Sequence, residues 1–164
     1  MFKEGGTARG GFKLRGEWVE LLFMTRAAEH GLRVIKPWGD SSRYDFVVET
    51  GGRFLRVQVK STSNRRRKLY ACTIRGTARR PYTAAEIDFF AIHVIPDDSW
   101  YIIPIEIASR VKYVIGLSPH NPLSQNARYK EAWHLLQEES MHELFSARAR
   151  GSVLTSNART SRSK

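Results

Sequence analysis

Apolar and polar positions recur with two different periods along this chain. Apolar side chains return every three or four residues between Leu14 and Leu22, which predicts a helix over 13–29 that ends at His30-Gly31. Farther along, short segments alternate with a period of two between glycine, proline or aspartate turns, which predicts strands. The predicted strands are 32–35, 44–50, 53–61, 68–75, 88–95, 99–103 and 112–117. Shorter helical segments are predicted at 83–86, 104–110 and 129–145.

The order of these elements predicts an α/β or α+β sheet domain. Gly51-Gly52 and Asp97-Asp98 each separate two predicted strands, so we expect two hairpins. The domain should cover 13–145. A glycine-rich arm, 1–12, precedes it, and a basic tail, 146–164, follows it and is predicted to be disordered.

Composition narrows the class of protein. The chain has 164 residues, of which 41% are hydrophobic, so it can form one domain with a substantial core. It contains no apolar run long enough for a membrane helix, and its first residues lack the apolar stretch of a signal peptide. Its single cysteine, Cys72, cannot form an internal disulfide. We therefore expect a cytoplasmic protein with no membrane partner.

The positive charge is concentrated in two segments. The net charge is +11, yet residues 53–80 hold ten basic and no acidic side chains, and 146–164 hold five more. This pattern indicates a polyanionic partner, by default nucleic acid, and so an association with the nucleoid. The candidate phosphate-contacting side chains are Arg43, Arg56, Arg65, Arg66, Arg67, Lys68, Arg75, Arg79 and Arg80.

One predicted hairpin carries a set of polar side chains where a buried strand would be apolar. Alternation along 53–61 places Arg56, Gln58 and Lys60 on one face, and three successive polar positions are unfavourable in a simple core. Asp45 starts the neighbouring strand. A carboxylate and an amide oxygen can hold a hard divalent cation. An adjacent lysine can orient or activate a water, or neutralise charge as a phosphodiester is attacked.

With Asp45 followed after twelve residues by Gln58-Val59-Lys60, the chain resembles the PD-(D/E)XK nucleases, with glutamine in place of the usual second acid. More narrowly, it is similar to the group I intron-associated homing endonucleases of this superfamily, whose active site uses the same Gln-x-Lys form. The likeness runs from 13 to 133. Its supporting motifs are Gly16-Glu17, 39–45, 56–60, 82–91 and 101–104.

The resemblance implies a restriction-endonuclease-like αβββαβ core, a mixed central sheet flanked by helices. It implies a catalytic set of Asp45, Gln58, Lys60 and Glu17, in which Asp45, Glu17 and Gln58 bind the metal. Glu20 lies one helical turn from Glu17 and is the alternative acid. The implied chemistry is Mg²⁺-dependent hydrolysis of double-stranded DNA, with Mn²⁺ as a substitute. Because two strands must be cut, a homodimer or homotetramer is expected.

Several alternatives stay open at this point. Asp45 could cap the turn at Ser41-Ser42, Lys60 could be an ordinary strand-end lysine, and 65–68 could be a solvated loop. Gln58 removes one negative charge from the metal site, so a catalytically decayed DNA-binding protein of the same fold is a rival hypothesis. A Holliday-junction or repair nuclease of the superfamily is another. RNA binding is compatible with the charge alone, although no RNA-binding signature is visible.

Overall fold

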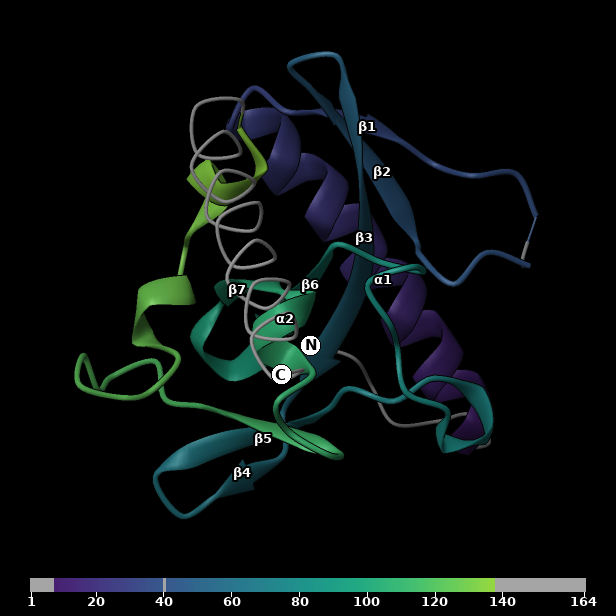
Figure 1. Ribbon diagram of the computed structural model, residues 1–164. Coiled ribbons are helices and arrows are strands. Elements are labelled where there is room, and N and C mark those ends of the chain that lie inside the picture. The colour runs from purple at the N-terminus through teal and green to yellow at the C-terminus, as the bar shows by residue number, and fades with distance from the viewer. Residues whose placement is uncertain (1–7, 40, 138–164) are drawn as a thin grey trace, which may run out of the picture.

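The computed structural model describes residues 8–39 and 41–137, and its centre is a mixed five-stranded sheet in the order β1-β2-β3-β6-β7. Strand β3 runs parallel to β6, and every other neighbouring pair in this sheet is antiparallel (Figure 1). The predicted mixed sheet is therefore confirmed. Its strands are β1 (Arg33–Ile35), β2 (Phe46–Thr50), β3 (Arg53–Thr62), β6 (Phe89–Val94) and β7 (Ser99–Pro104).

The hairpin between β2 and β3 forms as predicted at two glycines. Gly51 and Gly52 have φ angles of 52° and 72°, a left-handed conformation that glycine adopts without steric cost. The register pairs Phe46 with Val57 and Val47 with Arg56. This register places the start of β2 beside the middle of β3, where the polar positions lie.

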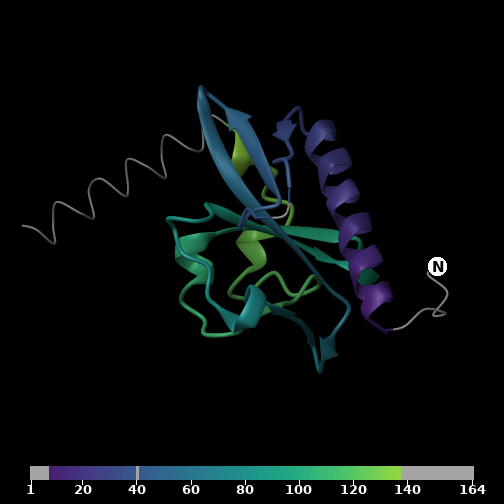
Figure 2. The same ribbon diagram turned by 90° about the vertical axis from the view of Figure 1, so that its right-hand side faces the viewer.

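Helix α1 (Ala8–Glu29) covers one face of the sheet (Figure 2). It buries Val19, Phe23 and Ala27 in a core shared with the sheet, and the Phe23 ring stacks on that of Phe46 at 5.3 Å between centroids. The helix begins five residues before the predicted start, because glycines within 8–12 weaken a helix by only about 1 kcal/mol each. Neither α1 nor any other described helix is long and apolar enough to cross a membrane.

A second sheet of three strands, in the order β4-β5-β8, lies below the first (Figure 1). The strands predicted at 68–75 and 112–117 therefore exist, and they pair with each other rather than with a strand of the central sheet. An apolar cluster that includes Ile92, Ile103 and Leu117 joins the two sheets. The elements involved are β4 (Arg65–Arg66), β5 (Leu69–Thr73), β8 (Val114–Leu117) and α2 (Ile105–Ala108).

Two predicted helical segments differ in the structure. Residues 83–86 form a single turn, in which the Glu86 carboxylate accepts hydrogen bonds from Thr83 N at 3.1 Å and Thr83 Oγ1 at 3.2 Å. The capping contact thus forms without a following helix. Within 129–137 the chain forms 3₁₀ turns rather than an α-helix, while 138–145 and the tail lie outside the described residues. The 3₁₀ helices are η1 (Thr77–Arg79), η2 (Ile95–Asp97), η3 (Ala127–Tyr129) and η4 (Trp133–Leu136).

Candidate active site

The pairing of β2 with β3 brings Asp45 and Gln58 together. Asp45 directly precedes β2, and its backbone N–H donates to Val57 O at 3.0 Å. Its Oδ2 accepts hydrogen bonds from Gln58 Nε2 at 2.5 Å and from Val59 N at 2.7 Å. Among the described residues, the hydrogen bonds of this carboxylate go to Oδ2, so Oδ1 can serve as a ligand. The structure thus joins two of the predicted site residues.

Gln58 is buried, with 7% of its surface exposed. Besides Asp45, its Nε2 donates to Val59 O at 3.2 Å. Both amide hydrogens therefore have acceptors, and the carbonyl Oε1 is left to act as an oxygen ligand. A glutamine in this arrangement orients the carboxylate and can also complete the oxygen shell of a cation.

The Asp45 carboxyl group titrates well above its ordinary range. Burial is the main cause, and the nearby negative charge of Glu20 adds to it. The hydrogen bond from Val59 N and the charges of Lys60 and Lys36 oppose the shift, and the pKa of Asp45 rises to about 6. Such a carboxylate is ionised at neutral pH but poorly solvated, which favours binding of a cation.

Helix α1 contributes Glu20 to this region more directly than Glu17. Glu20 has a side chain 26% exposed, and its Oε2 lies 2.9 Å from Lys36 Nζ. Glu17 is 55% exposed and lies 3.9 Å from Lys13 Nζ through its Oε1. Because Glu20 is also near enough to raise the pKa of Asp45, it is the better placed of the two alternatives.

Lys60 lies beside an aromatic ring that the sequence did not single out as part of the site. Its Nζ is 5.4 Å from the centroid of the Tyr82 ring, and the Arg43 guanidinium lies 4.2 Å from the same centroid. Lys60 is half-buried and close enough to Asp45 to oppose the rise in its pKa. Tyr82 belongs to the 82–91 motif, but nothing in the sequence places its ring against the lysine.

Two of the predicted phosphate-contacting arginines are engaged within the fold. Arg56 Nε lies 3.0 Å from Asp88 Oδ2, and its other nitrogens donate to the carbonyls of Ala84 and Ala85. Arg43 similarly pairs with Glu86 at 3.3 Å and donates to a backbone carbonyl. We therefore leave Arg56 and Arg43 out of the set that could contact a polyanion freely.

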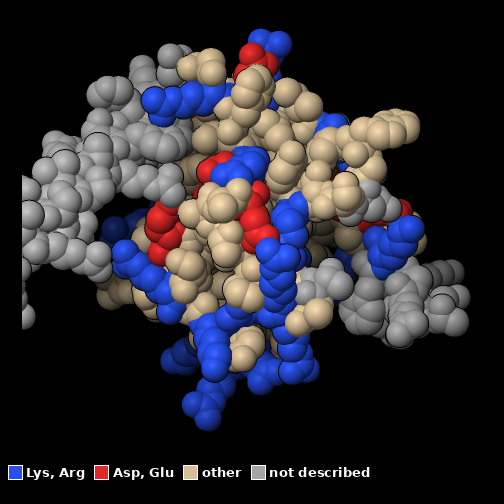
Figure 3. Space-filling model, turned by 45° about the vertical axis from the view of Figure 1, so that its right-hand side comes forward, with Lys and Arg blue, Asp and Glu red and all other residues tan. Residues whose placement is uncertain are grey.

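The remaining basic candidates lie mostly on the surface. Arg65 to Lys68 occupy the exposed tip of the β4–β5 hairpin, and Figure 3 shows Lys and Arg side chains gathered at this lower end of the molecule. Arg79 and Arg80 are also exposed, although Arg80 pairs with Glu86 at 2.6 Å. The half-buried Arg75 stacks on Tyr113. Among the described residues, the hairpin tip thus holds the densest group of exposed basic side chains.

The oxygen donors near Asp45 fit a hard cation that takes only a few of its ligands from the protein. No group of three or more His, Cys, Asp or Glu side chains among residues 8–39 and 41–137 could hold a metal ion. Asp45 and Glu20 supply carboxylate oxygens instead, and Gln58 supplies an amide oxygen. Mg²⁺ typically keeps several waters and binds one or two carboxylates together with a substrate phosphate. The residues present fit that pattern.

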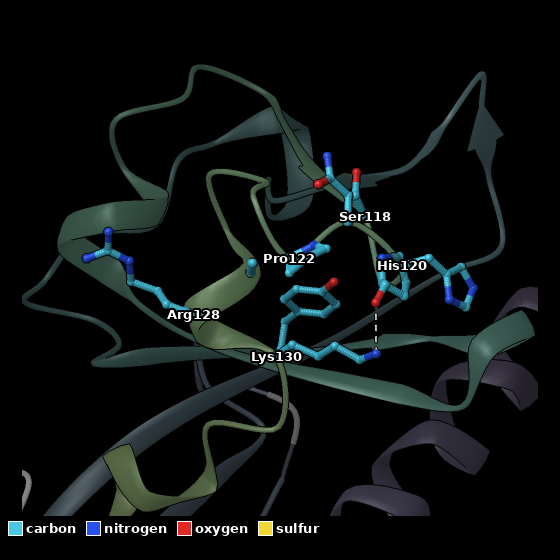
Figure 4. A pocket seen from close by; sticks show the side chains of 9 residues that line it. Ser118, His120, Pro122, Arg128 and Lys130 are labelled. Carbon is cyan, nitrogen blue, oxygen red and sulfur yellow. Dashed lines mark hydrogen bonds between the residues drawn. The ribbon is translucent and has the colours of Figure 1, made fainter.

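A separate cavity of about 510 Å³ lies beside the loop 118–122 and η3. Figure 4 shows Lys130 reaching across it to the Pro119 carbonyl, which accepts a hydrogen bond from Nζ at 2.9 Å. Tyr101 is among the residues that line the cavity, and its side chain is fully buried. None of the predicted site residues lines this cavity, and the candidate site remains the one around Asp45.

Comparisons with known proteins identify the family and the fold of the chain. A sequence model of the PD-(D/E)XK endonucleases matches residues 11–136. The solved structure of a bacterial homing endonuclease, I-Ssp6803I, matches with a TM-score of 0.67 and 30% sequence identity, over 80% of this chain and 93% of that chain. A comparison with curated proteins gave no match. The predicted restriction-endonuclease-like fold is confirmed by the structural match.

Proposed function

Because the chain belongs to the PD-(D/E)XK endonuclease family, we propose that it is a metal-dependent DNA endonuclease similar to the homing enzymes. The observation that carries the proposal is the contact of Gln58 Nε2 with Asp45 Oδ2 at 2.5 Å. Lys60 lies two residues farther along the same face of β3. This is the Asp…Gln-x-Lys pattern of the sequence, assembled in space.

Asp45 Oδ1, Gln58 Oε1 and Glu20 would hold a divalent cation, with Mg²⁺ the first candidate and Mn²⁺ a substitute. When bound, such an ion stabilises negative charge on the attacked phosphate and lowers the pKa of a bound water. Val59 N and Gln58 Nε2 fix the orientation of the Asp45 carboxylate. Glu17 lies one helical turn from Glu20 on α1 and would add negative charge near the cation.

Lys60 would serve the attacking water or neutralise charge on the phosphate as the bond breaks. Its ammonium group lies beside the Tyr82 ring, which removes part of its hydration shell and restricts where it can point. The result is a positive charge held at a defined place next to Asp45, which suits transition-state stabilisation better than a free surface lysine would.

Double-stranded DNA is the proposed substrate, and the hairpin tip 65–68 is the proposed backbone contact. Exposed arginines bind phosphate through paired N–H donors, and no acidic residue falls within 53–80. Cutting both strands requires two sites or two successive nicks. We therefore propose a homodimer or homotetramer as the working form.

One feature favours a second candidate, a DNA-binding protein that no longer cuts. Gln58 replaces an acid at the metal site, and the described residues contain no cluster of three possible metal-ligating acids, histidines or cysteines. Fewer negative charges weaken metal binding in the free protein. This candidate shares the fold and the basic hairpin and differs only in its chemistry.

The test is a cleavage assay on supercoiled plasmid, linear duplex and four-way junction DNA, with Mg²⁺, Mn²⁺ or EDTA. We expect nicked or linear plasmid with Mg²⁺ and none with EDTA. Lys60→Ala should bind DNA with unchanged affinity and yield no product. Salt-dependent DNA binding by the unmodified chain, without product in either metal, would support the non-cutting candidate instead. A preference for junctions would indicate a junction-resolving enzyme.

A further inference from the structure

Lys36 reaches the candidate metal site from the end of β1. Its Nζ lies 2.9 Å from Glu20 Oε2 on α1 and 5.7 Å from the centroid of the Phe46 ring. Phe46 directly follows Asp45 in the chain. The ammonium group therefore lies between helix α1 and the start of β2, which are the two elements that supply the carboxylates of the site.

Lys36 is surrounded by the carboxylates of the candidate metal site. Hydrogen bonding to Glu20 is the largest cause of a raised pKa at Lys36, and the charges of Asp45 and Glu17 add to it. These three carboxylates face three ammonium groups, those of Lys36, Lys60 and Lys13, whose Nζ lies 3.9 Å from Glu17 Oε1, so the local charges balance. Without Lys36 the balance would be −1, and an incoming divalent cation would be attracted more strongly.

We propose that Lys36 is the built-in counter-ion of the metal-free site and that it competes with a divalent cation for Glu20 and Asp45. The inference rests on the proposed metal dependence. The site already lacks one acid because of Gln58, so an ammonium group at Glu20 lowers its cation affinity further. The Lys36 side chain is 58% exposed, which leaves room for it to withdraw into solvent or toward a DNA phosphate.

The experiment is calorimetric titration of Mg²⁺ and Mn²⁺ into the full-length chain without DNA. It should be run at pH 8, where Asp45 is ionised in every variant. Lys36→Met removes the ammonium group, Lys36→Gln removes the charge but keeps a donor for Glu20, and Lys36→Arg keeps the charge. Arg33→Met is the matched control, because Arg33 lies on β1, three positions before Lys36 in the chain, but pairs with Glu49, at 3.4 Å.

We expect Lys36→Met and Lys36→Gln to tighten cation binding about tenfold, the effect of removing one neighbouring like charge near a protein surface. Lys36→Arg should remain within about twofold of the unmodified chain, and so should Arg33→Met. Thermal unfolding in EDTA identifies any variant that fails to fold. Equal or weaker cation binding in both folded neutral variants would overturn the proposal.

Failure of this inference can be told apart from failure of the proposed function. Mg²⁺-dependent cleavage by the unmodified chain, together with unchanged cation affinity in Lys36→Met and Lys36→Gln, would remove only the role of Lys36. No cation binding in any variant and no cleavage would overturn both.

Discussion

At the scale of single residues, the site around Asp45 is kept at a cost to folding. A carboxyl group with a pKa of about 6 in the folded chain and about 3.9 in the unfolded chain is most compatible with the fold when protonated. The contribution of this group to stability is therefore greatest below about pH 4 and falls as the pH rises through about 6. Functional sites commonly retain such unfavourable groups because the chemistry requires them.

Asp45→Asn should consequently stabilise the chain in a pH-dependent way. At pH 8 in EDTA we expect its free energy of unfolding to exceed that of the unmodified chain by about 1–3 kcal/mol. At pH 4 the difference should vanish, because Asp45 is then neutral too. Urea denaturation at both pH values measures this, with Glu49→Gln on β2 as a matched loss of one surface carboxylate. An equal gain at pH 4 and pH 8 would show that charge burial is not the cause.

The same carboxyl group would set a pH dependence for the proposed metal binding. Protonated Asp45 cannot bind a cation, so apparent Mg²⁺ affinity should decrease as the pH falls through about 6, approaching tenfold per pH unit below it. Calorimetric titration between pH 5 and pH 8 would measure the trend. Affinity that stays constant across this range would argue against Asp45 as a ligand.

The sequence alone was sufficient to pair Asp45 with Gln58, because strand alternation and a short hairpin determine which side chains meet. It left Glu17 and Glu20 as alternatives, since the choice depends on how α1 is rotated against the sheet. Lys36 and Tyr82 were missed for a related reason. Each reaches the site from a segment whose position is set by contacts distant in the sequence.

At the scale of elements, β3 serves the core on one face and the site on the other. Leu55, Val57 and Val59 are buried beneath α1, while Gln58 and Lys60 face the proposed substrate. Arg56 shows that not every polar position on this face belongs to the site, because it holds the 83–88 turn through Asp88. Strand alternation could not predict this difference between Arg56 and the site residues, because it assigns a side chain to a face of the sheet but does not identify the residue that it contacts.

Two arginine substitutions should separate these roles. Arg56→Met should lower the free energy of unfolding by about 1–3 kcal/mol, because it leaves the Asp88 carboxylate, 18% exposed, without its partner. Arg66→Met on the hairpin should change stability by less than about 0.5 kcal/mol but reduce the salt dependence of DNA binding by about one phosphate contact. Urea denaturation and binding at several salt concentrations measure both. The reverse pattern would contradict the assignment.

Strand pairing was likewise only partly predictable. Segments 68–75 and 112–117 have the composition of strands, and both form strands. Their membership of a second sheet depends on pairing between segments about 45 residues apart in the chain, which is a property of the assembled domain. The early start of α1 has a local cause instead, since its glycines weaken the helix without ending it.

At the scale of the whole molecule, the net charge of +11 resolves into separate regions. Four of the ten basic residues of 53–80 lie together at the tip of the β4–β5 hairpin, and Figure 3 shows that end of the molecule rich in Lys and Arg. Others, such as Arg56, support the fold. The charge therefore favours one end as the place where a DNA backbone would bind.

The central proposal is that Lys60, beside Asp45 and Gln58, is a catalytic residue of a metal-dependent DNA endonuclease. The most direct measurement is the single-turnover rate of DNA cleavage in Mg²⁺ at saturating protein, for the unmodified chain, Lys60→Met and Lys68→Met. We predict a rate loss of at least about 100-fold for Lys60→Met and an unchanged saturated rate for Lys68→Met, whose effect should be limited to affinity. Cleavage by Lys60→Met at the rate of the unmodified chain would contradict the account.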